Sequence, residues 1–145
     1  MNIQKFQKYS HEISPLYPAL ADKAEAISRA IENSPINVTA ISDGDGILVK
    51  HIIDSLYCAE AVARYAEASR GEGADGDPSG AERRLTLCDV GSGGGFPALP
   101  IAAALGDISV CALDSTAKKY RFIEESAASA GITNLTSVCA RAEEA

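Results

Sequence analysis

Hydrophobic residues in the first half of the chain recur at helical spacing. One set shares a helix face and predicts a helix that ends before Pro35: Leu20, Ala24, Ile27 and Ile31. A short extended segment, INVTAIS, and a turn over residues 43–46 follow. A second set predicts a helix from residue 47 to residue 68: Leu48, Ile52, Leu56, Ala59 and Ala63.

The spacing of hydrophobic residues changes after residue 68. Residues 69–82 are rich in Gly, Asp, Ser and Glu, which predicts a flexible linker or loop. Apolar runs at 85–90, 108–113 and 135–140 predict buried strands, and helical patterns at 97–105 and 116–130 lie between them. Strands that alternate with helices form βαβ units, so we expect an α/β fold with a parallel sheet.

Composition narrows the class of protein. A chain of 145 residues, 46% hydrophobic and 23% charged, is typical of one soluble globular domain. It contains no apolar stretch of membrane-spanning length and no signal peptide, so we expect a cytoplasmic protein without membrane contact. The net charge of −7 argues against nucleic-acid binding through bulk charge but allows a local basic patch.

The cysteines do not have the spacing of a metal or redox motif. Cys58, Cys88, Cys111 and Cys139 are widely separated, and three of them lie inside apolar runs. We therefore expect no metal, no disulfide bonds, and reduced, buried thiols in those runs.

A glycine-rich segment joins the first predicted strand to the next helix: Asp89-Val-Gly-Ser-Gly-Gly-Gly-Phe-Pro97. In this context such a loop indicates nucleotide binding, because glycine lets the backbone approach a ligand closely. Asp114 ends the next strand, 23 residues after Gly91, where a ribose-binding carboxylate belongs. The alternative is a tight turn that binds nothing, with Asp114 only capping the following helix.

The glycine spacing separates two cofactor classes. The dinucleotide fingerprint GxGxxG requires a glycine at position 96, where the chain has Phe96. Gly91, Gly93 and Gly95 form the GxGxG pattern of S-adenosylmethionine (SAM) enzymes instead. Methyl transfer is therefore favoured over an NAD-linked Rossmann oxidoreductase, for which a Tyr-xxx-Lys pair is also lacking.

Longer motifs extend this interpretation. DVGSGGGFPALPIA, LDSTAKKYRFIEE and CARAEEA, with INVTAIS and VKHIIDSL upstream, resemble the RsmG (glucose-inhibited division protein B) family from about Asn37 to Glu143. Members of that family are bacterial 16S ribosomal RNA guanine-N7 methyltransferases. The resemblance implies a Rossmann-like, SAM-dependent enzyme of rRNA processing that acts on 16S rRNA or the small ribosomal subunit and is a monomer when complete.

The resemblance also implies positions for the cofactor. SAM would contact Gly91 and Phe96 in the loop, and Ala142 and Glu143 after the third strand. Gly93, Gly95 and the ribose-binding Asp114 complete the predicted site, while Ala98 stands where the family usually has glycine.

Family members continue through further strands, so the resemblance implies that this chain is an N-terminal portion. We expect a helical region at 1–68, a linker at 69–82, and the first half of a Rossmann-like SAM-binding domain at 83–145. The main alternative to an enzyme is a truncated, non-catalytic SAM-binding module.

Basic residues suggest where RNA is bound. Lys118, Lys119 and Arg121 crowd the start of a predicted helix, where cations oppose the helix dipole, so they are candidates for phosphate contacts. Arg141 matches a family arginine and is a further candidate for RNA binding. The alternative for these residues is an ordinary solvated face.

The sequence allows two roles for each of two further sets of polar residues. His51 and Asp54 are three residues apart, close enough to pair, and either position substrate or tie their helix to the domain. Asn37 either hydrogen-bonds near the active site or caps a turn. Guanine N7 carries a free lone pair at neutral pH, so we assign no catalytic acid or base.

Overall fold

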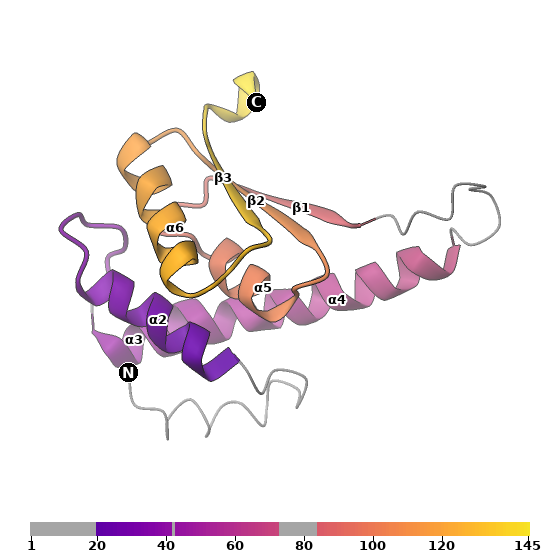
Figure 1. Ribbon diagram of the computed structural model, residues 1–145, viewed down its shortest axis with the longest axis horizontal. Helices are drawn as coiled ribbons and strands as arrows, with labels where there is room; N and C mark the ends of the chain where they lie inside the picture. The colour runs from indigo at the N-terminus through magenta and orange to yellow at the C-terminus, as the bar shows by residue number, and fades with distance from the viewer. Residues whose placement is uncertain (1–19, 42, 73–83) are drawn as a thin grey trace.

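The structure, a computed structural model, describes residues 20–41, 43–72 and 84–145 (Figure 1). Its first part contains helix α2 (Leu20–Glu32), the short helix α3 (Gly44–Ile47), the π-helical turn η1 (Leu48–Ile53) and helix α4 (Asp54–Glu72). Its second part contains, in order, β1 (Thr86–Val90), α5 (Ala98–Ala104), β2 (Ser109–Asp114), α6 (Ala117–Ser129), β3 (Leu135–Cys139) and the 3₁₀ turn η2 (Ala142–Glu144).

Both predicted helices of the first part are confirmed. α2 buries the face that the pattern defines, including Ala24 and Ile27, which are fully inaccessible to solvent. The second helix is the continuous run α3–η1–α4, which begins at Gly44 and reaches Glu72. Residues 69–72 are therefore helical rather than part of the predicted linker, because their one glycine, Gly71, does not interrupt the helix. Residues 73–82, and residues 1–19 of the predicted helical region, lie outside the described residues.

The sheet confirms the predicted α/β architecture. The strand order is β1-β2-β3 and both pairings are parallel, with Cys88 opposite Cys111 and Cys111 opposite Thr136. The two crossovers, through α5 and α6, move across the sheet in the same direction. Since such crossovers are right-handed, both helices lie on the same face (Figure 1).

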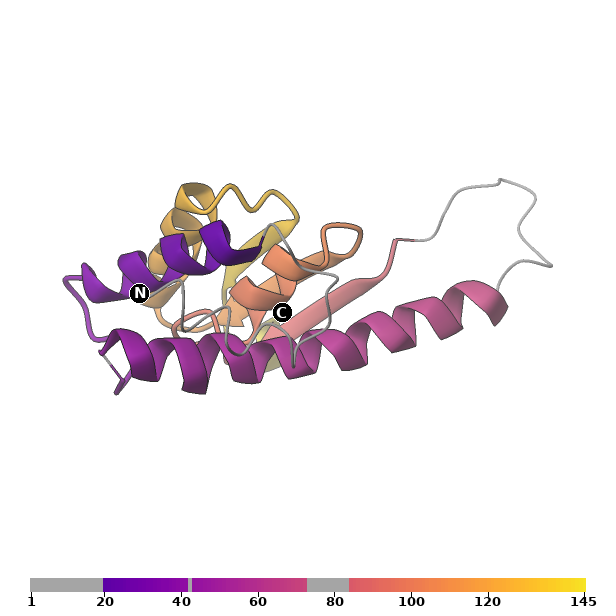
Figure 2. The ribbon, with the colours of Figure 1, turned by 90° about the horizontal axis from the view of Figure 1, so that it is seen from below.

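A single core joins the two parts of the chain. α5 and α6 contact the sheet, α2 packs against both of these helices, and α4 packs along α5 (Figure 2). The core includes Val110 and Ala112 of β2 together with buried helix residues: Ile27, Ile52, Leu56, Leu99, Ile101 and Ile123. The division of the chain into a helical region and a SAM-binding domain stays a prediction. Within the described ranges, no helix is long and apolar enough to cross a membrane.

The opposite face of the sheet differs from the prediction. β1 alternates exposed and half-buried residues, and Val90 is 61% exposed, so the apolar run at 85–90 forms an edge strand of the described sheet and not a buried one. The expected burial of the thiols is wrong too, since Cys88 and Cys139 are exposed and Cys111 is half-buried. The exposure of β1 and Cys88 follows from their position: among the described residues β1 pairs with β2 alone, and α5 and α6 cover the other face of the sheet. All four cysteines are free.

Candidate cofactor-binding site

The glycine loop leaves the carboxyl end of β1 and is tied to the end of β2. The N–H groups of Gly91 and Ser92 donate to the Leu113 carbonyl, with N–O distances of 2.8 and 3.0 Å. The Gly95 N–H then donates to the Ser92 carbonyl at 2.8 Å. Gly91, Gly93 and Gly95 have φ angles of +82°, +57° and +85°, in the left-handed region that favours glycine. The GxGxG spacing is therefore what this backbone path requires.

The loop has two distinct sides. A Cβ atom added to Gly91 would meet nothing within 4 Å, and one added to Gly93 would meet only the Gly91 carbonyl, at 3.8 Å. A Cβ at Gly94 would lie 2.9 Å from the Val38 carbonyl oxygen, and one at Gly95 would lie 2.5 Å from Leu99 Cδ1. We call the first pair the open side and the second pair the packed side. Only the open side offers bare backbone to a ligand.

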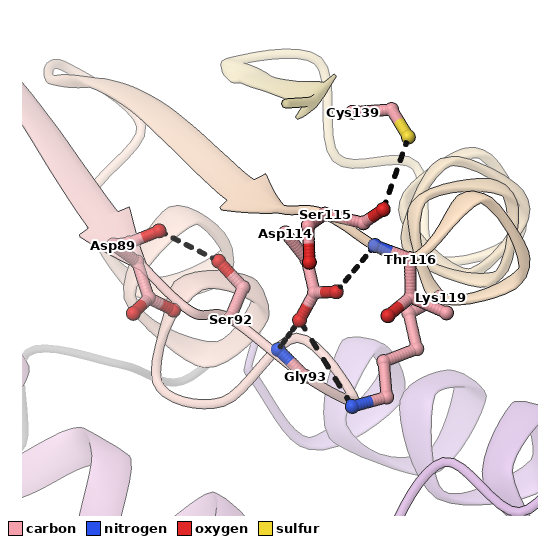
Figure 3. A network of polar contacts seen from close by, with 8 residues as sticks. All are labelled: Asp89, Ser92, Gly93, Asp114, Ser115, Thr116, Lys119 and Cys139. Carbon is pink, nitrogen blue, oxygen red and sulfur yellow. Dashed lines mark hydrogen bonds and ion pairs between the residues drawn. The ribbon is translucent and has the colours of Figure 1, made fainter. Parts of the chain in front are cut away.

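Asp114 lies beside the loop, at the end of β2 (Figure 3). Its Oδ2 accepts the Gly93 N–H at 3.0 Å and its Oδ1 accepts the Thr116 N–H at 2.8 Å. The residue is only 8% exposed. The Thr116 hydroxyl is a further hydrogen-bond partner of this carboxylate. An ionised carboxylate has about four acceptor positions, so one remains for a ligand hydroxyl. The Thr116 contact supports the start of α6, while the Gly93 contact joins the carboxylate to the loop.

The surroundings of Asp114 favour its charged form. Burial alone would raise the pKa of the carboxyl. The N–H groups of Thr116 and Gly93 and the charge of Lys119 outweigh that effect and lower the pKa below its ordinary value of 3.8. Asp114 is therefore ionised at neutral pH.

The structure separates the predicted basic cluster. Lys119 turns toward the site, with its Nζ atom 4.0 Å from Asp114 Oδ2 (Figure 3). Lys118 and Arg121 are exposed on α6. Only these two keep the solvated position from which a phosphate could be reached.

The segment after β3 carries its own ion pair. Arg141 Nε lies 2.6 Å from Glu143 Oε1, and both side chains are exposed. The Glu143 backbone N–H and this contact lower the pKa of Glu143. Ala142, also exposed, begins η2. Because the strands are parallel, η2 follows the same edge of the sheet as the loop, but the cofactor contacts of Ala142 and Glu143 stay predictions.

Asp89 is a carboxylate at the loop that we did not single out from the sequence. It is half-buried, and its Oδ2 accepts the Ala98 N–H at 3.2 Å, while its carbonyl accepts the Ser92 hydroxyl at 2.8 Å (Figure 3). Burial raises the pKa of Asp89 and outweighs the hydrogen bonds from Ser92 and Ala98. An acidic residue near the end of an apolar strand, two residues before the first glycine of the loop, was the available signal.

His51 contacts the glycine loop and the segment that precedes η1. Its Nε2 atom lies 2.6 Å from Thr39 Oγ1, and its ring stacks on Phe96 with centroids 4.7 Å apart and an interplanar angle of 18°. Asp54 is exposed and acts on His51 through its charge, and Asn37 is exposed as well. Of the two interpretations of His51, the structure supports the one in which it ties its helix to the domain.

These observations define a class of protein. A parallel sheet, a glycine loop after β1 and a carboxylate that ends β2 and bonds the loop form a Rossmann-like fold of the kind that binds nucleotide cofactors. Residues 24–145 match the family described as rRNA small subunit methyltransferase G (GidB). The chain belongs to this family, which confirms the resemblance found in the sequence.

Curated relatives carry the same name. A ribosomal RNA small subunit methyltransferase G from Acidovorax sp. (strain JS42) is 37% identical over 111 residues, which cover 77% of this chain and 46% of the relative. One from Limosilactobacillus reuteri (strain DSM 20016) is 31% identical over 146 residues, or 99% of this chain and 54% of the relative. One from Cupriavidus pinatubonensis is 39% identical over 102 residues, or 70% and 40%. The chain thus spans about half the length of the curated relatives it matches.

Proposed function

We propose that this chain binds S-adenosylmethionine at its glycine loop and serves the N7-methylation of a guanine in bacterial 16S ribosomal RNA, in the cytoplasm. The observation that carries the proposal is the hydrogen bond from the Gly93 N–H to Asp114, which places an ionised carboxylate beside the open side of the loop. Membership of a family named for methylation of small-subunit rRNA supports the substrate class.

The residues present fit an adenosine cofactor. Gly91 and Gly93 offer backbone without a side chain, and Asp114 keeps acceptor capacity for a ribose hydroxyl. Phe96 lines the end of the same loop, and Ala142 and Glu143 would complete the site from η2. Gly95 faces Leu99, so any contribution it makes is through its backbone.

Little proton chemistry is required of the chain. SAM supplies an electrophilic methyl group when it is bound. Guanine N7 is an unprotonated acceptor exposed at the major-groove edge of the base, so it needs no general base to act as nucleophile. The protein's part is to align the reactants, which removes an entropic cost from the reaction. A carboxylate that orients the ribose and a loop that fits the donor are sufficient for that role.

Lys118 and Arg121 are the proposed RNA contacts. Both are exposed on α6, the helix that starts just after Asp114, so they lie near the cofactor end of the sheet. Phosphate contacts of this kind fix the position of RNA without reading its sequence. Lys119 and Arg141 each face a carboxylate, Asp114 and Glu143 respectively, so we assign them a smaller part in RNA binding.

The decisive experiment combines binding and transfer. Titration calorimetry compares SAM with NADH, and tritiated SAM is supplied with small ribosomal subunits that lack the methyl group. We expect SAM binding by the full-length protein and label at N7 of one guanine. NADH as the tighter ligand would favour an oxidoreductase. SAM binding by the full-length protein without transfer to any subunit would favour the non-catalytic module.

The RNA contacts have a matched test. Lys118→Gln with Arg121→Gln should lower methylation and reduce its dependence on salt, while SAM affinity stays unchanged. Arg29→Gln with Arg64→Gln removes the same charge at exposed positions on α2 and α4 and should leave methylation unchanged. Equal losses from both double variants would show that only the overall charge matters.

A further inference from the structure

Residues that precede the sheet press on the packed side of the glycine loop at two points. The Val38 carbonyl lies against Gly94, so closely that a Cβ there would be 2.9 Å from its oxygen. The next residue, Thr39, contacts His51, whose ring in turn stacks on Phe96 at the end of the loop. Thr39, His51 and Phe96 come from three separate segments of the chain, so this contact exists only in the folded protein.

The hydrogen bonds define how the imidazole is held. Thr39 Oγ1 accepts the Ile41 N–H at 3.2 Å and lies 2.6 Å from His51 Nε2, so the imidazole is hydrogen-bonded to a hydroxyl that the backbone of Ile41 itself holds. Burial lowers the pKa of His51, and the Asp54 charge and a backbone hydrogen bond at Lys50 only partly oppose this. The ring is therefore neutral at neutral pH, and its Nε2 atom shares a hydrogen bond with the Thr39 hydroxyl.

The stack transmits this orientation to the loop. The two rings are nearly parallel, 18° apart, with centroids at 4.7 Å, an offset-stacked geometry that is favourable for aromatic pairs. The Phe96 N–H donates to the Ser92 carbonyl at 3.2 Å, so the position of Phe96 is linked to the turn that contains Gly93. His51 itself lies in the π-helical turn η1, and such turns within helices are frequent at functional sites.

We propose that His51 is a positioning residue for the cofactor loop: held by Thr39 and stacked on Phe96, it keeps the open side of the loop in the shape that receives the methyl donor. This rests on the proposed function, since it assumes that the loop binds SAM. His51 acts through Phe96. Because the loop is ordered before the donor arrives, binding loses less conformational entropy.

The test separates stacking from hydrogen bonding. SAM affinity is measured by titration calorimetry on the full-length protein and on His51→Ala, His51→Phe and Thr39→Val. His51→Ala loses both contacts and should weaken binding about threefold to tenfold. His51→Phe keeps a ring on Phe96 and should stay within about twofold of wild type. Thr39→Val should fall between them. Tyr57→Ala, which removes a 49% exposed aromatic residue from α4, is the matched control and should bind normally.

A spectroscopic measurement reports on the stack without SAM. The ring protons of His51 should show an upfield ring-current shift by NMR that disappears in Phe96→Leu. Equal weakening by His51→Ala and His51→Phe, an unshifted His51 resonance, or unchanged affinity in His51→Ala would overturn the positioning role while leaving the proposed function intact. Failure of the wild-type protein to bind SAM would overturn the proposed function and the positioning role with it.

Discussion

The open and packed sides of the glycine loop both require glycine, but for different reasons. On the packed side, Gly94 and Gly95 have no room for a Cβ, because Val38 and Leu99 occupy that space. On the open side, Gly91 and Gly93 have room for one but adopt φ angles that disfavour it. Glycines of one loop can therefore serve packing or ligand access. Substitutions on the two sides should separate stability from binding.

The largest effect is expected on the packed side. Gly95→Ala would combine a positive φ of +85° with a contact of 2.5 Å to Leu99 Cδ1. Left-handed strain costs about 1–2 kcal/mol and overpacking about 1–3 kcal/mol, so the free energy of unfolding should fall by about 2–5 kcal/mol. Urea denaturation checks this. Gly106→Ala, where a Cβ meets nothing within 4 Å, is the control and should change little. Similar losses in both variants would refute a packed side.

Asp114→Asn acts on the side that faces the ligand. The substitution removes the negative charge that the Gly93 and Thr116 N–H groups share, which should lower the free energy of unfolding by about 1–3 kcal/mol. SAM affinity should fall as well. Glu32→Gln, at an exposed position in α2, should change neither quantity. Unchanged SAM affinity in a folded Asp114→Asn protein would remove Asp114 from the site.

The same variant has a defined pH dependence. The folded-state pKa of Asp114 is lowered, so its ionised form stabilises the fold above the ordinary pKa of 3.8. This stabilisation is lost as the pH falls through the folded-state pKa. The difference in unfolding free energy between wild type and Asp114→Asn should thus be constant near neutrality and shrink below about pH 4.

Gly91→Ala should affect binding more than stability. Its φ of +82° costs about 1 kcal/mol when a side chain is present, but the added Cβ meets no protein atom. If the donor approaches the open side, the methyl group should occupy that space and weaken SAM binding by more than tenfold in calorimetry. A normal affinity would show that the donor does not approach Gly91.

Asp89→Asn should have the smallest effect, and an opposite pH trend. Burial raises the pKa of Asp89, so its ionised form is less favourable in the folded state than in the unfolded chain. The wild-type protein should gain stability relative to Asp89→Asn as the pH falls through the raised pKa toward 3.8. Near neutrality we expect the two to differ by about 1 kcal/mol or less. Thermal unfolding from pH 7 to pH 4 measures both.

The sequence was informative where a pattern is local. Helical spacing located α2, and a glycine-rich segment between an apolar run and a helical pattern located the loop between β1 and α5. The apolar run of β1 indicated a buried strand, but apolar content alone does not say whether a strand lies at an edge of the described sheet or which face is covered. Composition also ended α4 too early, since a single glycine, Gly71, costs only about 1 kcal/mol in a helix.

The contacts around the glycine loop could not be predicted from the sequence, for a different reason. The His51–Phe96 stack joins residues far apart in the chain, and nothing in either local segment specifies the partner. Lys119 illustrates the same limit: its neighbours Lys118 and Arg121 have the same chemistry, and only the path of α6 turns one of the three toward Asp114. The residue types of this basic cluster indicated a site, but only the folded structure shows which of the three residues faces Asp114.

The π-helical turn η1 constrains the length of the chain as well as its composition. One residue more than an α-helix accommodates in that turn shifts the rotational phase of the helix by about 100°. Deleting Ile52 or Ile53 would restore a regular helix and rotate the preceding residues relative to α4. Ile47 and Leu48, both buried, would then leave the core, and His51 would lose its alignment with Phe96. In this segment a conservative substitution is tolerable, whereas a change of register is not.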